Sequence, residues 1–262
     1  MTRFDDIWKK WDREKLDEYI KSHEKERTRY LDLVRDHLGK APERRVLEVG
    51  CGAAIDLHLV AEGTGCDACG VDISREALDI AKDLERYFSG KVDLRVGDAR
   101  ALEFADGTFD VVFSQGLIEH FERPVDILRE QVRVLKPGGI LIVNVPQRYT
   151  VYTLYKHLLA MRGLWEWGDE TEFSSWQLSC YGRLLGLEFL EKRGYDYWRS
   201  PFELMFVLRT LNGKAGKIPL VKRCPVHDVI SRFWDAVWED IENRYGHLFM
   251  KNIVYAYRKP VE

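Results

Sequence analysis

Long apolar runs are missing from this chain of 262 residues, and their absence limits where the protein can work. A membrane-spanning helix needs about 18 to 20 consecutive apolar residues, and a stretch such as 202–208 is far shorter. The opening residues, MTRFDDIWKKW, are charged and lack the apolar segment of a secretory signal peptide. We therefore expect no spanning helix and a cytoplasmic location.

The chain also lacks a strong excess of charge of either sign. Its formal net charge is −3, with 45% hydrophobic and 32% charged residues. Proteins that bind nucleic acid usually carry a basic excess that neutralises phosphates, so we expect no nucleic-acid partner. The composition is that of an ordinary folded domain able to bury a core.

Cysteine is scarce, and its five positions form no obvious framework. An odd number in a chain of this length indicates reduced thiols rather than a set of disulfides. Cys66 and Cys69 have the spacing of a zinc or redox pair, but no second pair of ligands follows. We interpret both as buried structural thiols and expect no metal site.

What the sequence does contain is a regular alternation of short apolar runs and helical patterns. It predicts strands at 45–49, 68–73, 92–97, 109–114 and 140–145, helices at 54–62, 74–88 and 124–135, and a turn at 136–139. Ser74 is placed to cap the second of these helices. Such alternation is typical of a parallel sheet with helices on both faces, an α/β fold.

Two flanking regions follow a different pattern. A long helix is predicted over 4–38, and the part after Pro146 reads as helices at 150–162 and 174–185, a strand at 187–197, two or more helices within 201–246 and a last strand at 249–259. The segment WGDETE at 167–172 resembles one that precedes the corresponding helix in a known enzyme family, and this resemblance implies that its acids cap the helix at 174–185.

The run VLEVGCGAA, residues 46–54, ends the first strand in two glycines that bracket one residue. A Gly-x-Gly turn between a strand and a helix lets a nucleotide approach the main chain. The third glycine of the dinucleotide fingerprint is replaced by Ile55, and Glu48 would repel a pyrophosphate, so the turn does not favour NAD. A ligand that carries an ammonium group suits Glu48 better.

Two further acids follow the next strands. Asp72 closes the second strand, 20 residues after Gly52, where a carboxylate can accept the hydroxyls of a ribose. Asp98 follows the third strand and can accept from the exocyclic amine of adenine. The simpler interpretations are that Asp72 caps the helix near Ser74 and that Asp98 only makes a turn.

Together, the segments VLEVGCGAA, GVDIS, VGDA, FDVVFSQGLIEHF and LKPGGILIVNVP resemble the class I S-adenosylmethionine-dependent methyltransferases, most closely the type 11 branch that includes the ubiquinone and menaquinone methyltransferases. The resemblance covers about residues 40–150. It implies a Rossmann-like sheet of seven mostly parallel strands and S-adenosylmethionine as cofactor. It also implies cofactor contacts from Glu48, Gly50, Cys51, Gly52, Asp72, Ile73, Asp98, Ala99, Ser114, Gln115 and Gly116.

Two features depart from the family pattern. Ala54 stands where a third glycine is frequent, and residues 201–246 form an unusually long insertion between the two strands that end the sheet as a hairpin. We therefore expect an N-terminal helical cap at 1–40 and a methyltransferase domain at 41–262. Within that domain, 147–185 and 201–246 would be helical additions on the substrate side.

The acceptor is a small molecule by this interpretation, and aromatic residues between 149 and 202 suit an apolar, aromatic or lipid-like one. The residues after the fourth strand, beginning at Ser114, lack the Asn/Asp-Pro-Pro-aromatic turn and the Pro-Cys nucleophile of DNA methyltransferases. His120 or Tyr149 would take the acceptor's proton, although residues 119–120 also fit a solvated helix edge. Basic residues at 214–223 beside aromatic ones leave peripheral membrane contact open.

Two other functions fit the same residues. The protein can be a binding or regulatory protein that holds S-adenosylmethionine without turnover. Less favoured is a nicotinamide oxidoreductase, because the turn lacks its third glycine and carries Glu48.

Overall fold

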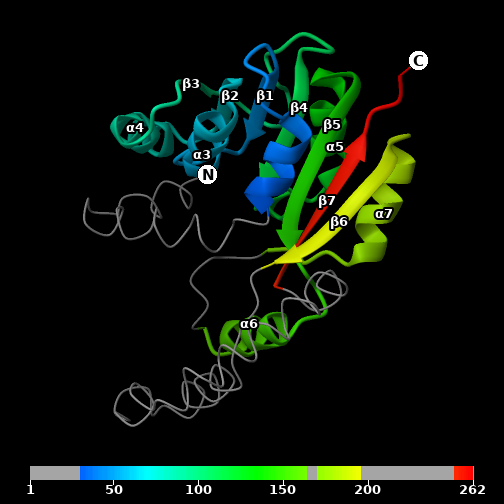
Figure 1. Ribbon diagram of the computed structural model, residues 1–262. Helices are drawn as coiled ribbons and strands as arrows, with labels where there is room; N and C mark the ends of the chain where they lie inside the picture. The colour runs from blue at the N-terminus through cyan, green and yellow to red at the C-terminus, as the bar shows by residue number, and fades with distance from the viewer. Residues whose placement is uncertain (1–29, 164–169, 196–250, 262) are drawn as a thin grey trace, which may run out of the picture.

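The computed structural model describes residues 30–163, 170–195 and 251–261 (Figure 1). Seven strands form one sheet in the order β3-β2-β1-β4-β5-β7-β6. The strands are β1 Arg45–Val49, β2 Asp67–Asp72, β3 Val92–Val96, β4 Phe109–Gln115, β5 Leu135–Pro146, β6 Glu188–Tyr195 and β7 Asn252–Arg258. The helices are α3 Ile55–Thr64, α4 Arg75–Leu84, α5 Pro124–Val134, α6 Val151–Met161 and α7 Ser175–Leu184, with short 3₁₀ turns η1 Glu85–Tyr87 and η2 Ile118–His120. Residues 30–38 are also helical.

The sheet is mostly parallel, as predicted. Strands β1 to β5 run parallel to one another. β7 lies between β5 and β6 and is antiparallel to both. The two strands that end the chain therefore form the expected hairpin, and the Rossmann-like fold of the class I methyltransferases is confirmed.

Helices cover both faces of the sheet because alternate strand residues point to opposite sides. Val46 and Phe113 pack with helix 30–38, α3 and α4. Leu47 and Val112 pack with α5 and α7 on the other face. α6 lies apart from these layers, beyond the ends to which the parallel strands point (Figure 1).

One predicted turn is wrong. Residues 136–139 belong to β5, whose pairing with β4 passes from Leu135 directly to Ile140. The four residues form a bulge because the chain beyond β7 satisfies their backbone groups. Gly138 N–H donates to the Lys259 carbonyl at 2.9 Å, and Lys259 N–H donates to the Gly139 carbonyl at 2.9 Å.

Local signals placed other boundaries well. Ser74 caps α4, its hydroxyl accepting from Ala77 N–H at 3.1 Å. Cys66 and Cys69 are buried free thiols. Within the described ranges, none of the helices is both long and apolar enough to cross a bilayer. Most of the helix predicted at 4–38 (residues 4–29), the insertion predicted at 201–246 and its suggested membrane contact lie outside the described residues.

Candidate functional site

The glycine turn follows β1 at the end of the sheet where the parallel strands terminate. Gly50 and Gly52 have φ angles of 73° and 52°, which only glycine adopts readily. The N–H groups of Gly50 and Cys51 both donate to the Val71 carbonyl, at 2.8 and 3.1 Å. A Cβ atom on Gly50 would lie 2.7 Å from Cδ1 of Leu117, so a side chain there would collide with the loop after β4. The turn thus needs its bare backbone.

Glu48 brings a buried carboxylate to this turn. Its side chain is 3% exposed, and the residue lies between Gly70 of β2 and Phe113 of β4. Burial, together with the charges of Glu48 and Asp72, raises the pKa of the Cys51 thiol. Cys51 therefore stays a neutral thiol and contributes its backbone to the turn.

Asp72 joins the glycine turn to α4. One carboxylate oxygen accepts from Gly52 N–H at 2.7 Å and the other from Ser74 N–H at 2.8 Å. Both interpretations of Asp72 therefore have a basis: its carboxylate supports the start of α4, and it stands beside the glycine turn where a ribose would bind. Ile73, next along the chain, is 46% exposed and offers an apolar surface beside it.

Asp98 is engaged in a turn after β3. Its carboxylate accepts from the Arg100 backbone N–H at 2.9 Å and from the Arg100 guanidinium. These hydrogen bonds outweigh partial burial and lower the pKa of Asp98. Ala99 is buried at 9% exposure. The turn interpretation is therefore realised, and an adenine amine would have to use a remaining acceptor position.

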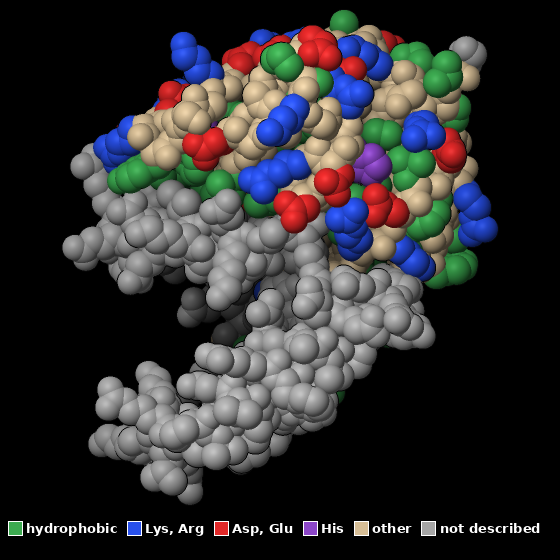
Figure 2. All heavy atoms as spheres, in the orientation of Figure 1, with side chains coloured by type: hydrophobic (Ala, Val, Ile, Leu, Met, Phe, Trp, Pro, Cys, Tyr) green, Lys and Arg blue, Asp and Glu red, His purple; other side chains and the backbone are tan. Residues whose placement is uncertain are grey.

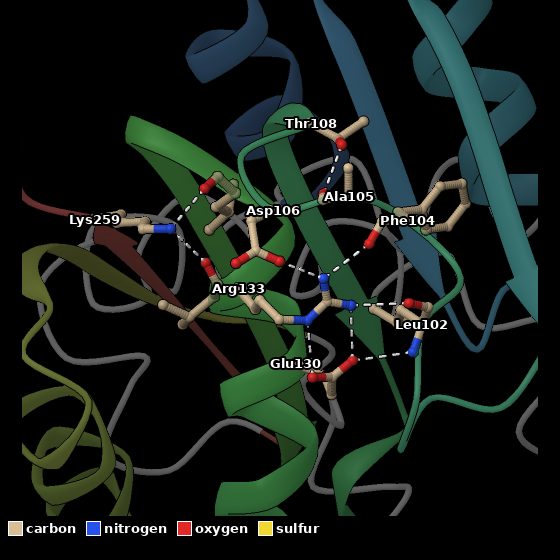
Figure 3. A network of polar contacts seen from close by, with 10 residues as sticks. Leu102, Phe104, Ala105, Asp106, Thr108, Glu130, Arg133 and Lys259 are labelled. Atoms are coloured by element: carbon tan, nitrogen blue, oxygen red, sulfur yellow. Dashed lines mark hydrogen bonds and ion pairs between the residues drawn. The ribbon is translucent and has the colours of Figure 1, made fainter.

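The loop that follows Asp98 is tied to α5 by Arg133, as Figure 3 shows. The Arg133 guanidinium donates to the carbonyls of Leu102 and Phe104, both at 2.8 Å, and to Asp106 at 2.7 Å. Glu130 accepts from Arg133 and from Leu102 N–H at 3.0 Å. This network fixes the loop at 102–106 to α5.

The end of β4 combines one buried and two accessible positions. Ser114 is 1% exposed and its hydroxyl donates to the Gln131 side chain of α5 at 3.3 Å. Gln115 and Gly116 are more accessible. Gly116 has φ 60°, and its N–H donates to the Asn144 carbonyl of β5 at 3.1 Å. Ser114 is thus positioned as a support, while Gln115 and Gly116 face outward.

The two residues expected to move a proton are both exposed. His120 ends η2, and desolvation by neighbouring protein lowers its pKa although its side chain remains accessible. Tyr149 is 70% exposed in the loop between β5 and α6. His120 is therefore a neutral imidazole near pH 7, and neither residue is enclosed by the protein.

Sequence reasoning missed the neighbour of His120. Glu119 is 5% exposed, so the solvated-edge interpretation is wrong for this residue. Burial and the nearby charge of Glu170 raise the pKa of Glu119 to about 8, against the opposing charge of Lys156. Its apolar neighbours Leu117, Ile118 and Phe121 were the signal that the segment turns inward.

The acids of the segment before α7 also differ from expectation. α7 is capped by Ser174 in a capping box with Gln177. Glu172 and Glu170 instead bind Lys156 of α6, whose Nζ lies 2.5 and 3.1 Å from their carboxylates. These ion pairs hold α6 to the segment at 170–174, and the burial of Lys156 shields them from water. In the described part of the chain, His, Cys, Asp and Glu side chains form no cluster that could hold a metal ion.

Comparison with known proteins adds to this geometry. A family model described as a methyltransferase domain matches residues 47–143. The ubiquinone biosynthesis O-methyltransferase of Ralstonia nicotianae is 32% identical over 163 residues, which cover 59% of this chain and 67% of that protein. The chain belongs to the class I S-adenosylmethionine-dependent methyltransferases of type 11. The family's cofactor is S-adenosylmethionine.

Other relatives of this methyltransferase match over shorter segments. The demethylmenaquinone methyltransferase of Renibacterium salmoninarum is 36% identical over 134 residues, 48% of this chain and 54% of that protein. The methyltransferase GfsG of Streptomyces halstedii is 31% identical over 117 residues, 44% of this chain and 42% of that protein. The chain thus spans about half the length of these two relatives.

Solved structures share the fold over most of the chain. The [4+2]-cyclase SpnF superposes with a TM-score of 0.60 at 26% identity, covering 89% of this chain and 81% of that one. Phosphoethanolamine N-methyltransferase 2 of Haemonchus contortus, solved with S-adenosylmethionine, has a TM-score of 0.58 at 19% identity, covering 99% of this chain and 60% of that one. Since one neighbour is a cyclase, the fold alone does not fix the reaction.

Proposed function

We propose that this protein transfers the methyl group of S-adenosylmethionine to a small-molecule acceptor. The observation that carries the proposal is the linked pair of Gly52 and Asp72, because the 2.7 Å bond between them fixes a bare turn beside a carboxylate. Glu48 would bind the ammonium of the methionine moiety and Asp72 the ribose. Ile73 would pack on the adenine, and Asp98 and Ala99 would meet its edge.

S-adenosylmethionine, when bound, supplies a methyl group on a sulfonium whose leaving group is a neutral thioether. The protein's task is then to align the acceptor with that methyl group and to exclude water. Gln115 and Gly116 are the residues at the end of β4 that would border the acceptor. The loop from Leu117 onward would close the space over the glycine turn.

A small acceptor is supported by the surface and by the named relatives. Acidic and basic side chains are interspersed over the face that Figure 2 shows, which is a poor match to a nucleic-acid backbone. The names of the relatives mention ubiquinone biosynthesis, demethylmenaquinone and phosphoethanolamine. The last two compounds serve as probe acceptors, and a catechol, chosen as a small aromatic hydroxyl acceptor, is the third.

The first test is calorimetric titration of the full chain with S-adenosylmethionine and, in parallel, with NAD. We expect micromolar binding of the first and no binding of the second. Asp72→Asn should weaken binding roughly tenfold or more, because it removes one charged acceptor worth about 1.5–3 kcal/mol. Asp79→Asn, on the exposed side of α4, is the control and should bind like the wild type.

Transfer itself is measured with methyl-labelled S-adenosylmethionine and the three probes. Label in any probe supports the proposal. Binding without transfer to a probe, or to the small molecules of a cell extract, would instead favour a binding protein. Heat from NAD alone would favour the oxidoreductase.

A further inference from the structure

Glu119 lies in η2, just beyond the end of β4, where the acceptor is expected. Its carboxyl group is buried. Its Oε2 atom has no hydrogen-bond partner among the residues that the structure describes. Its Oε1 atom lies 3.5 Å from the point where a Cβ of Gly116 would stand. Gly116 is exposed and carries no side chain, so this carboxyl group lies close to the accessible end of β4.

The surroundings hold Glu119 in place without giving its carboxyl group an ion-pair partner among the described residues. The Glu119 carbonyl accepts from Thr171 N–H at 3.0 Å, which ties η2 to the segment at 170–174. Lys156 is the cation whose charge lowers the pKa of Glu119, and it already binds Glu170 and Glu172. The acids therefore outnumber the cation here, and the site favours a ligand that brings a proton donor.

We propose that Glu119 is the general base that takes the proton from a hydroxyl or amine acceptor, an inference that rests on the proposed methyl transfer. The acceptor heteroatom forms a bond to the methyl carbon as the carbon–sulfur bond breaks and its electron pair stays on sulfur. The heteroatom's proton moves to a carboxylate oxygen of Glu119.

This assignment differs from the one that the sequence suggested. A general base must lie within reach of the proton it removes and is most effective when its pKa is near the working pH. Glu119 is enclosed and its pKa lies near the working pH, whereas Tyr149 is largely in solvent. Among the described residues, the charged groups that act on Glu119 are Glu170 and Lys156, both from segments packed against its turn.

The first readout needs no acceptor. Glutamate labelled with ¹³C at the carboxyl carbon, in the full chain with S-adenosylmethionine bound, should show one signal that titrates near pH 8. That signal should be missing in Glu119→Gln and present in the control Glu122→Gln, an exposed acid of the same loop. A Glu119 signal that titrates near the ordinary value of about 4.3 would overturn the proposal.

The second readout is turnover with the catechol and phosphoethanolamine probes. Glu119→Gln should lower kcat about 100-fold or more, as loss of a general base does, and leave the Kd of S-adenosylmethionine within twofold. The rise of wild-type kcat with pH should disappear in Glu119→Gln, and Glu119→Asp should recover part of the rate.

The outcomes separate the two proposals. Full activity of Glu119→Gln, or a rate loss with an unchanged pH profile, would overturn the role of Glu119 alone. Failure of the wild type to methylate any acceptor would overturn the proposed function and this inference with it.

Discussion

Ala54 occupies a backbone conformation that its side chain disfavours. It stands before α3 with φ 54°, and it is the one non-glycine residue of positive φ in the described ranges. This explains why a glycine is frequent here in the family: the chain turns left-handed to enter the helix. The methyl group of Ala54 strains the backbone at this φ angle. The residue is only 1% exposed, so burial of the same methyl group contributes favourably to stability.

We expect Ala54→Gly to change the free energy of unfolding by less than about 0.5 kcal/mol. Relief of roughly 1–2 kcal/mol of left-handed strain offsets the entropy of glycine and the loss of a buried methyl. Ala53→Gly is the control, since Ala53 is equally buried but has no positive φ. It should cost about 1–2 kcal/mol. Urea denaturation measures both, and equal losses would contradict the strain at Ala54.

At the scale of elements, α5 organises the loop that carries Asp98. Arg133 sits in the last turn of the helix, and its side chain is 29% exposed. Its contacts reach residues far back in the chain at Leu102, Phe104 and Asp106, which no helical periodicity reveals. Arg129, one turn earlier, makes one exposed ion pair, with Asp126, within the part of the chain that the structure describes.

Arg133→Met should destabilise the fold by about 1–3 kcal/mol and weaken S-adenosylmethionine binding severalfold, because the loop loses its charge-assisted hydrogen bonds. Arg129→Met is the matched control and should cost less than about 1 kcal/mol, as exposed ion pairs do. Denaturation and calorimetric titration check the two effects. Unchanged affinity in Arg133→Met would mean that the loop keeps its shape without this network.

Elements also show where sequence patterns were informative. β1 begins and ends at the predicted residues, and β2, α5 and α7 lie within one residue of prediction, because apolar periodicity and capping signals are local. The prediction for residues 136–139 was wrong because a Pro-Gly-Gly run is typical of a turn. Their place in β5 instead depends on hydrogen bonds to Lys259, more than a hundred residues away in the chain.

For the whole molecule, the last strand completes the sheet. β7 lies between β5 and β6, and its five central residues, Ile253, Val254, Tyr255, Ala256 and Tyr257, are at most 4% exposed. The Tyr257 hydroxyl donates to the Leu178 carbonyl of α7 at 2.7 Å. The chain's end is thus as much part of the core as β1.

A chain that ends at residue 250 should fail to fold cooperatively. Loss of β7 removes large buried side chains worth roughly 1.5–3 kcal/mol each, which together exceed much of the 5–15 kcal/mol that stabilises a typical domain. A chain that ends at Lys259 keeps the strand and the Lys259 contacts and should melt like the full protein. Circular dichroism melting curves of the two truncations decide the matter, and a cooperative transition in the shorter chain would refute it.

The sequence by itself determined the alternation of strands and helices, the glycine turn and the carboxylates at the ends of β1 and β2. These follow from local rules: apolar period, glycine's tolerance of positive φ, and the meeting of parallel strand ends at one edge. Only the tertiary structure decided that Glu119 is buried while His120 is exposed. Burial of a charged side chain depends on segments remote in sequence, here α6 and residues 170–174, whose packing no local pattern encodes.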